Sequence, residues 1–128
     1  MVGNVTIRVR GVSRATSARS AGASTYQALK NGEEYLLVDV SVRCLSAKES
    51  CHVTEFDFGV QSASGRDTPA ELTSSSSSLH VFEGGTISPG RSVSGSLIFI
   101  IRQKDRDFKL YYPRGFAFGG SAEVILGR

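Results

Sequence analysis

The chain of 128 residues is 40% hydrophobic and 21% charged, and 15 Lys and Arg residues against 12 Asp and Glu residues give it a net charge of +3. This length and composition predict one globular domain, residues 1–128, and exclude a disordered or fibrous chain. Acidic residues are nearly as numerous as basic ones, which argues against a nucleic-acid binder. The longest apolar run, 97–101, is far shorter than the roughly 20 residues that span a bilayer, so we expect no transmembrane segment.

The N-terminal third predicts two strands separated by a long connection. Residues 5–10 alternate apolar and polar side chains, which predicts a short strand with Arg8 and Arg10 on its outer face. Residues 11–32 are rich in Ser, Ala, Arg and Gly, and we expect a surface connection there that ends in an Asn-Gly turn. Residues 34–43 alternate again, with a β-branched inner face, and predict the second strand.

The middle of the chain predicts a third strand and a loop. Residues 52–61 place Phe56, Phe58 and Val60 in register, and we expect this segment to pair antiparallel with the strand before it. After a Gly-Arg-Asp turn, residues 68–78 contain five consecutive serines. Because such a segment cannot bury enough apolar area to offset about 1–2 kcal/mol of ordering entropy per residue, we expect a mobile loop.

The rest of the chain is organised around residues 88–101, a Pro-Gly turn followed by the longest strand-like run. Gly95 lies within this run, where it marks a bulge or a close approach of another backbone. Ile98 and Ile100 face away from the main apolar side and would meet water in a simple two-layer sandwich, which makes them a candidate interface. We expect residues 11–30 to fold over them, anchored by Val12, Tyr26 and Leu29, and dimerisation through the same patch is the alternative.

The C-terminal part predicts a charged hairpin tip at residues 102–107, followed by strands at 108–112 and 122–126. Gly, Pro and Ser clusters separate about seven predicted strands, and no long helical pattern is present. The sequence therefore predicts an all-β fold, an antiparallel immunoglobulin-like β-sandwich.

Several segments, in an order that holds across residues 32–126, carry a family resemblance. They are Gly-Glu-Glu-Tyr-Leu-Leu-Val-Asp-Val-Ser-Val at 32–42, Asp-Phe-Gly-Val at 57–60 with Gly65, Pro89-Gly90 with Gly95 and Leu-Ile-Phe at 97–99, and Phe-Lys-Leu-Tyr-Tyr-Pro at 108–113 before 124–126. The chain resembles the telokin-like, immunoglobulin-type domain of unknown function found in bacterial secreted proteins and lipoproteins, the group of the mycobacterial immunoprotective secreted antigen. This resemblance implies a secreted or surface-anchored, non-enzymatic domain. Cys44 departs from the family pattern, which usually has Asn there, and the departure suggests a local disulfide.

Cys44 and Cys51 are the two cysteines of the chain and lie at the end of one predicted strand and the start of the next. They could form a disulfide, remain free thiols, or begin a zinc site with His52. A zinc site requires four ligands, and His80 stands at no metal-binding spacing from them. Because closing so short a loop stabilises by roughly 2.5 kcal/mol, we expect the disulfide, and we expect no metal.

No pattern of catalytic residues stands out, and we expect no enzymatic activity. The serines could be combined with His52 or His80, but no nucleophile elbow is present. The carboxylate pairs at 33–34 and at Glu55 with Asp57 fit solvated strand edges and turns. The Gly-Gly pairs are not followed by Lys-Ser or Lys-Thr, so we expect no nucleotide and no other cofactor.

Two groups of residues are candidates for partner binding. Four arginines on the first strand and the adjoining loop could converge, although a solvated face balanced by acidic residues is the alternative. A loop near the C-terminus combines aromatic and basic residues, the composition of a binding hot spot, although packing over an open end of the sandwich is the alternative. The candidates are Arg8, Arg10, Arg14 and Arg19, and Tyr111, Arg114, Phe116 and Phe118.

These observations predict an extracellular or cell-surface binding domain whose partner is a protein or a cell-envelope component, and which is a monomer or a weak dimer. The first residues show no signal segment, so we expect a signal or lipid anchor to have been removed from a longer precursor. The alternative is a carbohydrate-binding or glycan-hydrolysing module of a secreted protein, against which the absence of Trp counts.

Overall fold

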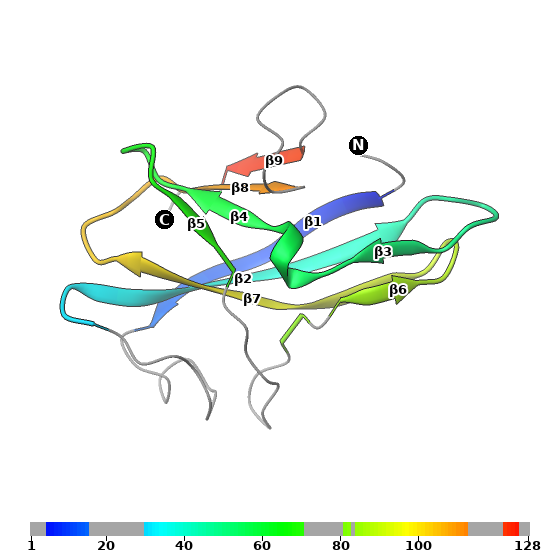
Figure 1. Ribbon diagram of the computed structural model, residues 1–128, viewed down its shortest axis with the longest axis horizontal. Coiled ribbons are helices and arrows are strands. Elements are labelled where there is room, and N and C mark those ends of the chain that lie inside the picture. The colour runs from blue at the N-terminus through cyan, green and yellow to red at the C-terminus, as the bar shows by residue number, and fades with distance from the viewer. Residues whose placement is uncertain (1–4, 16–29, 71–80, 83, 113–121, 126–128) are drawn as a thin grey trace.

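The computed structural model describes residues 5–15, 30–70, 81–82, 84–112 and 122–125. These residues form nine strands and one short 3-10 turn, η1, and confirm the all-β, antiparallel sandwich (Figure 1). The elements are β1 (Val5–Ala15), β2 (Glu33–Cys44), β3 (Cys51–Val53), η1 (Glu55–Asp57), β4 (Gly59–Gln61), β5 (Asp67–Pro69), β6 (Gly85–Ile87), β7 (Ser92–Arg102), β8 (Lys109–Tyr112) and β9 (Ala122–Ile125).

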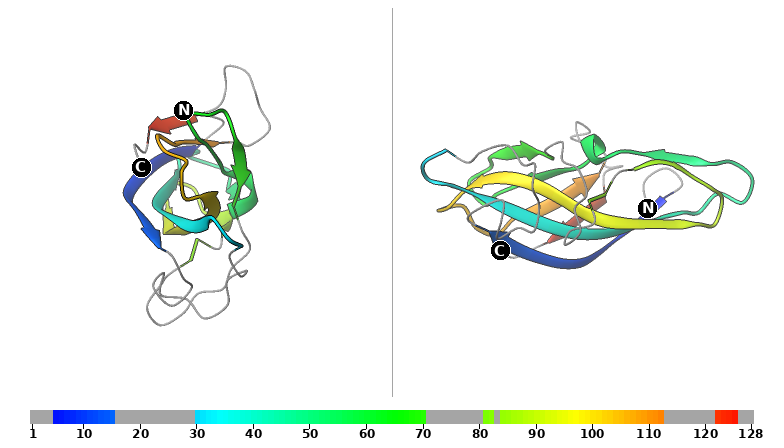
Figure 2. Two further views of the ribbon diagram at one scale, coloured as in Figure 1. Left: turned by 90° about the vertical axis from the view of Figure 1, so that its left-hand side faces the viewer. Right: turned by 90° about the horizontal axis from the view of Figure 1, so that it is seen from below.

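The strands form two main layers and a small extension. One layer has the order β1-β2-β7, and the other has the order β5-β4-β8-β9. In Figure 1 the four-stranded layer lies above the three-stranded one, and the end view in Figure 2 shows the strands wrapping around a common interior. The two-stranded sheet β3-β6 continues the sandwich at one end.

The long pair β2 and β7 forms the centre of the three-stranded layer. It is in register from Glu33 opposite Arg102 to Arg43 opposite Ser92. The predicted inner faces of both strands are confirmed, because their apolar residues belong to the main core. The buried members of that core on these strands are Leu36, Val38, Val40, Val42, Leu97, Phe99 and Ile101.

The outer face of this pair is also covered. Ile98 is only 1% exposed and belongs to a second buried cluster with Ala15, Tyr35, Leu37 and Val81, against which the partly buried Ile100 packs. Of the segment 11–30 that is predicted to cover this face, Ala15 packs in the same cluster as Ile98. An interface at Ile98 and Ile100 stays a prediction. Val12 does not anchor a cover here, because it packs against the main core; Tyr26 and Leu29 lie outside the described residues.

Strand β1 continues to Ala15, and the expectation of a surface connection from Gly11 is wrong for residues 11–15. Its backbone pairs with β2 along its whole length, with a register shift between Val9 and Gly11. An extra residue in one strand reverses which side chains face the core beyond it. Arg14 therefore lies opposite Leu36, on the inner face of the layer.

The segment 52–61 does not pair with β2, contrary to the prediction. It divides into β3, which pairs with β6, then η1, and then β4, which pairs with β5 and β8. The backbone N–H of Thr54 donates to the Asp57 carboxylate (2.8 Å) at the start of the turn. Phe56 lies on this turn and is 52% exposed, so its predicted place in the core is wrong; Phe58 and Val60 are buried as predicted.

Two connections also differ from the predictions. The expected loop at 68–78 begins as strand β5, where Thr68 and Ala70 are buried, while residues 71–80 are not among those described. Residues 103–108 are not a hairpin tip, because β7 and β8 belong to different layers. The close backbone approach predicted at Gly95 is confirmed: a Cβ there would lie 2.6 Å from the Phe82 Cα.

Candidate functional site

The predicted disulfide between Cys44 and Cys51 is present, with a Cα–Cα distance of 5.6 Å. It joins the end of β2 in the three-stranded layer to the start of β3 in the two-stranded sheet. Both cysteines are buried. Because the bond occupies both sulfurs, neither thiol is available to bind zinc, and the described residues contain no group of three or more metal-ligating side chains.

Three turns meet at the opposite end of the sandwich and form what we call the charged end. They are the turn before β2 (30–33), the turn between β4 and β5 (62–66), and the connection between β7 and β8 (103–108). The backbone N–H of Gln103 donates to the Gly32 carbonyl (2.9 Å), and that of Ala63 donates to the Arg106 carbonyl (3.1 Å). The β7–β8 connection is thus tied to both of the other turns.

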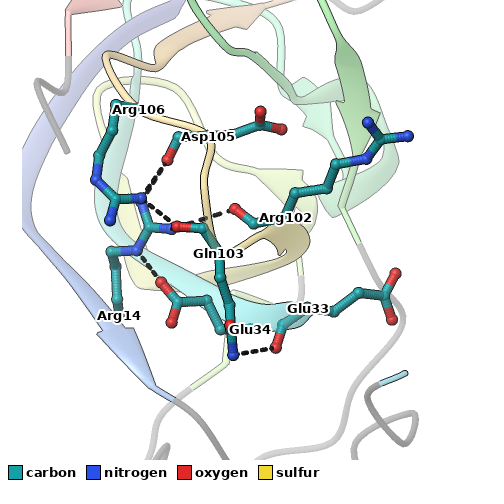
Figure 3. Close-up of polar contacts among 7 residues, drawn as sticks. All are labelled: Arg14, Glu33, Glu34, Arg102, Gln103, Asp105 and Arg106. Carbon is teal, nitrogen blue, oxygen red and sulfur yellow. Dashed lines mark hydrogen bonds and ion pairs between the residues drawn. The ribbon is translucent and has the colours of Figure 1, made fainter. Parts of the chain in front are cut away.

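Arg14 fixes the course of this connection from the inside (Figure 3). Its guanidinium forms an ion pair with Glu34 and donates to the backbone carbonyls of Asp105 (2.9 Å), Gln103 (3.1 Å) and Arg102 (3.3 Å). The guanidinium carbon also lies 5.9 Å from the centre of the Phe108 ring, within the range of a cation–π contact. Arg14 therefore acts as a structural clamp, and its position on the inner face separates it from Arg8 and Arg10.

A groove of about 510 Å³ lies on the outside of the same turns. A second hollow of about 210 Å³ shares three of its lining residues, Lys30, Glu33 and Arg66, so the two are adjacent. We call the combined surface the cationic groove. Its first part is lined by Lys30, Asn31, Gly32, Glu33, Arg66, Arg102, Gln103 and Lys104, and the second adds Asp67, Thr68, Pro69 and Ile100.

Positive charge dominates the first part of the groove, where four basic side chains face a single acidic one. The basic residues are exposed, and within the part of the chain that the structure describes none of them forms an ion pair. Glu33 is held by its turn, because its carboxylate accepts a hydrogen bond from the Lys30 backbone N–H (2.7 Å). Figure 3 shows the Arg102 guanidinium and the Glu33 carboxylate extending away from Arg14. Cations that converge on a concave surface focus a positive potential there.

Of the residues predicted to bind a partner, those that the structure describes do not line the cationic groove. Arg8 and Arg10 are exposed on the outer face of β1, around a hollow of about 550 Å³ that also includes Val9 and Ser41. Tyr111 is partly buried, with its ring 2.7 Å from the position that a Cβ on Gly59 would take. Partner binding by these residues stays a prediction. Arg19, Arg114, Phe116 and Phe118 fall beyond the described residues.

The cationic groove is not evident in the sequence, because its basic residues come from three turns that are far apart in the chain. A local signal exists, since each turn carries a cation beside its turn-forming residues: Lys30 before Asn-Gly, Arg66 after Gly, and Arg102 with Lys104 after the central strand. No pattern in the sequence shows that these three turns meet. Their proximity follows from the pairing of β7 with β2 and of β4 with β8.

The carboxylate pair Glu55 and Asp57 lies on the turn η1. Asp57 accepts the hydrogen bond that begins η1, and it lies close enough to Tyr112 to act on its ionisation. The pKa of the Tyr112 hydroxyl is raised above its usual value of 10.0, first by burial and then by the negative charge of Asp57. The Tyr112 ring packs against Phe58, with ring centres 5.1 Å apart. These contacts give Asp57 a structural role, and neither carboxylate lines one of the described hollows.

The fold and the site define an antiparallel β-sandwich with one disulfide and an open cationic surface. Residues 1–123 match the family described as "Domain of unknown function (DUF4352)", and the chain belongs to this family. No curated protein matches the chain. In the described residues, no helix has the length and apolar character needed to cross a membrane.

Solved structures with the same fold share little sequence with this chain. The candidate lipoprotein ycdA of Bacillus subtilis is 18% identical with a TM-score of 0.72; the match covers 99% of this chain and 38% of ycdA, so this chain spans well under half of that protein. The yjhA protein of Bacillus subtilis is 16% identical with a TM-score of 0.69, covering 99% and 93% of the two chains. The secreted protein MPT63 of Mycobacterium tuberculosis is 13% identical with a TM-score of 0.66, covering 97% and 82%.

Proposed function

We propose that this domain is a non-enzymatic binding module that works outside the cytoplasm, and that the cationic groove is its ligand-binding surface. The single observation that carries the proposal is the convergence of four unpaired cations, from three turns, on one groove. Charges of one sign that converge on a concave surface repel each other and focus a positive potential there, which favours a ligand of opposite charge. The partner that fits is an acidic component of the cell envelope.

The location outside the cytoplasm has two supports. The Cys44–Cys51 disulfide belongs to the oxidising compartments in which such bonds persist. Two of the structures with this fold are a candidate lipoprotein and a secreted protein. We extend that location to this chain as part of the proposal.

Retention on a dextran sulfate column tests the proposed surface. The groove variant combines Arg66→Gln, Arg102→Gln and Lys104→Gln, and the control variant combines Arg43→Gln, Lys48→Gln and Arg91→Gln. The control residues are exposed near the disulfide end, so both variants lose three positive charges. Because focused charge attracts more strongly than dispersed charge, we expect the groove variant to elute at a clearly lower salt concentration than the control.

Equal elution of the two variants would show that only net charge matters, and the proposed binding surface would then be rejected. A third variant, Arg8→Gln with Arg10→Gln, tests the outer face of β1. If this variant elutes earlier than the groove variant, binding belongs to that face. Thermal unfolding of all variants confirms that each remains folded.

A further inference from the structure

We infer that the ligand of the cationic groove is an acidic polymer in which carboxylate or phosphodiester groups are separated by hydroxyl-bearing units. This inference rests on the proposed function, since it names the chemistry of the ligand at the same surface. Three features of the groove carry it: the exposure of its cations, its extent over two adjacent hollows, and the hydrogen-bonding groups placed between its charges.

The exposure of the cations favours a polymer over a single small anion. Lys30, Arg66, Arg102 and Lys104 are all exposed, and an ion pair in contact with water changes affinity by only a few-fold. A ligand with one acidic group would therefore bind weakly. A chain with repeated acidic groups engages several cations at once, and each further contact forms at a high effective concentration.

The shape of the groove favours an extended ligand. The larger hollow, beside Arg102 and Lys104, adjoins the smaller hollow, beside Thr68 and Pro69. Lys30 and Arg66 line both hollows, while Arg102 and Lys104 line the larger one alone, so the four cations do not all surround one hollow. This arrangement matches charges spaced along a chain.

The groups between the cations favour a ligand that also carries hydroxyls. Asn31 and Gln103 line the larger hollow with side chains that donate and accept hydrogen bonds, and Thr68 does the same in the smaller hollow. Glu33 lines both hollows, and its ionised carboxylate is a hydrogen-bond acceptor with no donor. Its carboxylate repels a densely charged anion such as polyphosphate but can accept a hydrogen bond from a hydroxyl group.

The backbone beneath the groove is held in place before any ligand arrives. The Gln103 N–H bonds to the Gly32 carbonyl, and the Arg14 clamp holds the carbonyls of Arg102 and Asp105 from the other side. The Gln103 side-chain amide also donates to the Glu33 carbonyl (3.4 Å). Binding therefore needs to order side chains only, which lowers its entropic cost.

Calorimetric titration of the whole chain tests the inference with four probes at one low salt concentration. Polygalacturonate supplies carboxylates with hydroxyls, poly(glycerol phosphate) supplies phosphodiesters with hydroxyls, polyphosphate supplies charge without hydroxyls, and galacturonic acid supplies a single carboxylate. We expect one or both hydroxyl-bearing polymers to bind at least about 100-fold more tightly than the monomer, within the range that multivalency provides. The polymer that binds more tightly identifies the acidic group.

The Glu33→Gln variant separates charge density from hydroxyl recognition. Gln keeps an acceptor for the Lys30 backbone N–H but removes the negative charge. We expect the variant to bind polyphosphate at least about tenfold more tightly than the wild type does, a change of about one unit in log K from a lost like charge in a partly screened groove. Its affinity for the hydroxyl-bearing polymers should change less.

The outcomes distinguish this inference from the proposed function. If polyphosphate binds the wild type most tightly, or if galacturonic acid binds as well as its polymer, the inference is wrong. The groove variant used on the dextran sulfate column would still lose retention in that case, and the proposed surface would stand. If the groove variant and its charge-matched control bind every probe equally, both ideas fail together.

Discussion

The two ends of the sandwich are closed in different ways. At one end, the Cys44–Cys51 bond joins two sheets, and the turn before β7 is attached to the same place: the Gly90 N–H donates to the Cys44 carbonyl (2.9 Å), and the Cys44 N–H donates to the Arg91 carbonyl (2.9 Å). At the charged end, no cysteine is present, and Arg14 collects three backbone carbonyls and one carboxylate.

This difference shows how one end can carry unpaired charge without losing its shape. At the disulfide end, a covalent bond joins β2 to β3, and the exposed Arg43, Lys48 and Arg91 lie around it. At the charged end, the partly buried Arg14 and the Arg106 guanidinium donate to the carbonyls that follow β7, so the Arg102 and Lys104 side chains need not do so. Their side chains are left to line the groove. The comparison predicts that stability depends on Arg14 and binding depends on the exposed cations.

The largest expected effect comes from breaking the charged end with Arg14→Ala. This change leaves the partly buried Glu34 carboxylate without its ion-pair partner and removes one of two donors from each of three carbonyls. The Arg106 guanidinium still donates to the Gln103 and Asp105 carbonyls, and the Asp105 N–H still donates to the Arg102 carbonyl. Hydrogen bonds to charged groups contribute about 1.5–3 kcal/mol each before water replaces part of the loss. We expect the free energy of unfolding to fall by about 3 kcal/mol in urea titrations. The free energy of unfolding of Arg14→Lys should lie between those of Arg14→Ala and the wild type, since an ammonium group keeps the charge but cannot reproduce the planar fork of the guanidinium.

Arg102→Gln is the matched change on the outer side of the same connection. Because the Arg102 side chain is exposed, we expect the free energy of unfolding of this variant to stay within about 0.5 kcal/mol of the wild-type value. If Arg14→Ala and Arg102→Gln have equal effects on unfolding, the clamp has no special role. The distinction between a structural and a binding cation at this end would then be lost.

The contrast between these two arginines marks the limit of what the sequence predicts. The alternating residues of β2 and β7 predict their buried faces, because a period of two in apolar residues directly reflects one-sided burial. Arg14 falls in a Ser- and Ala-rich stretch, and nothing local indicates that the register shift after Val9 turns it inward. The shift depends on pairing with β2, which is a property of the folded sheet.

The same limit applies to strands of three residues. β3, β5 and β6 are too short to show a period, and β3 pairs with β6 across more than thirty residues of sequence. Phe56 looked like a core residue because it continues the alternation of Phe58 and Val60. The intervening turn η1 breaks that alternation and places Phe56 outside. The cationic groove could not be predicted for a related reason, because it exists only where three turns meet.

Removing the disulfide tests the other end and should have a slightly smaller effect. In the chain-entropy model, a loop of this length contributes roughly 2.5 kcal/mol, so Cys44→Ala with Cys51→Ala should lower the free energy of unfolding by about that amount. Elution from dextran sulfate should not change, because the groove lies at the opposite end. A reductant should destabilise the wild type and leave the double variant unaffected.

Thiol labelling of protein recovered from its native cells sharpens the same test. If the domain works outside the cytoplasm, both cysteines should resist alkylation until a reductant is added. Labelling of two free cysteines in the native protein would argue against that location. Earlier elution of the double variant from dextran sulfate would show instead that the two ends are coupled.

The smallest expected effect concerns Tyr112, which takes part in none of the contacts described for the two ends. Its variant therefore serves as a comparison for the variants at those ends. Burial, and then the charge of Asp57, raise the pKa of its hydroxyl above 10.0, so the folded state holds this proton at a pH where the unfolded chain releases it. The stability that the protonated hydroxyl contributes is present below about pH 10 and is lost as the pH rises through the folded-state pKa. Tyr112→Phe should therefore unfold with less dependence on pH above 10 than the wild type, while Arg14→Ala and the cysteine double variant should keep the wild-type dependence. An unchanged alkaline profile in Tyr112→Phe would show that Tyr112 does not contribute to that loss.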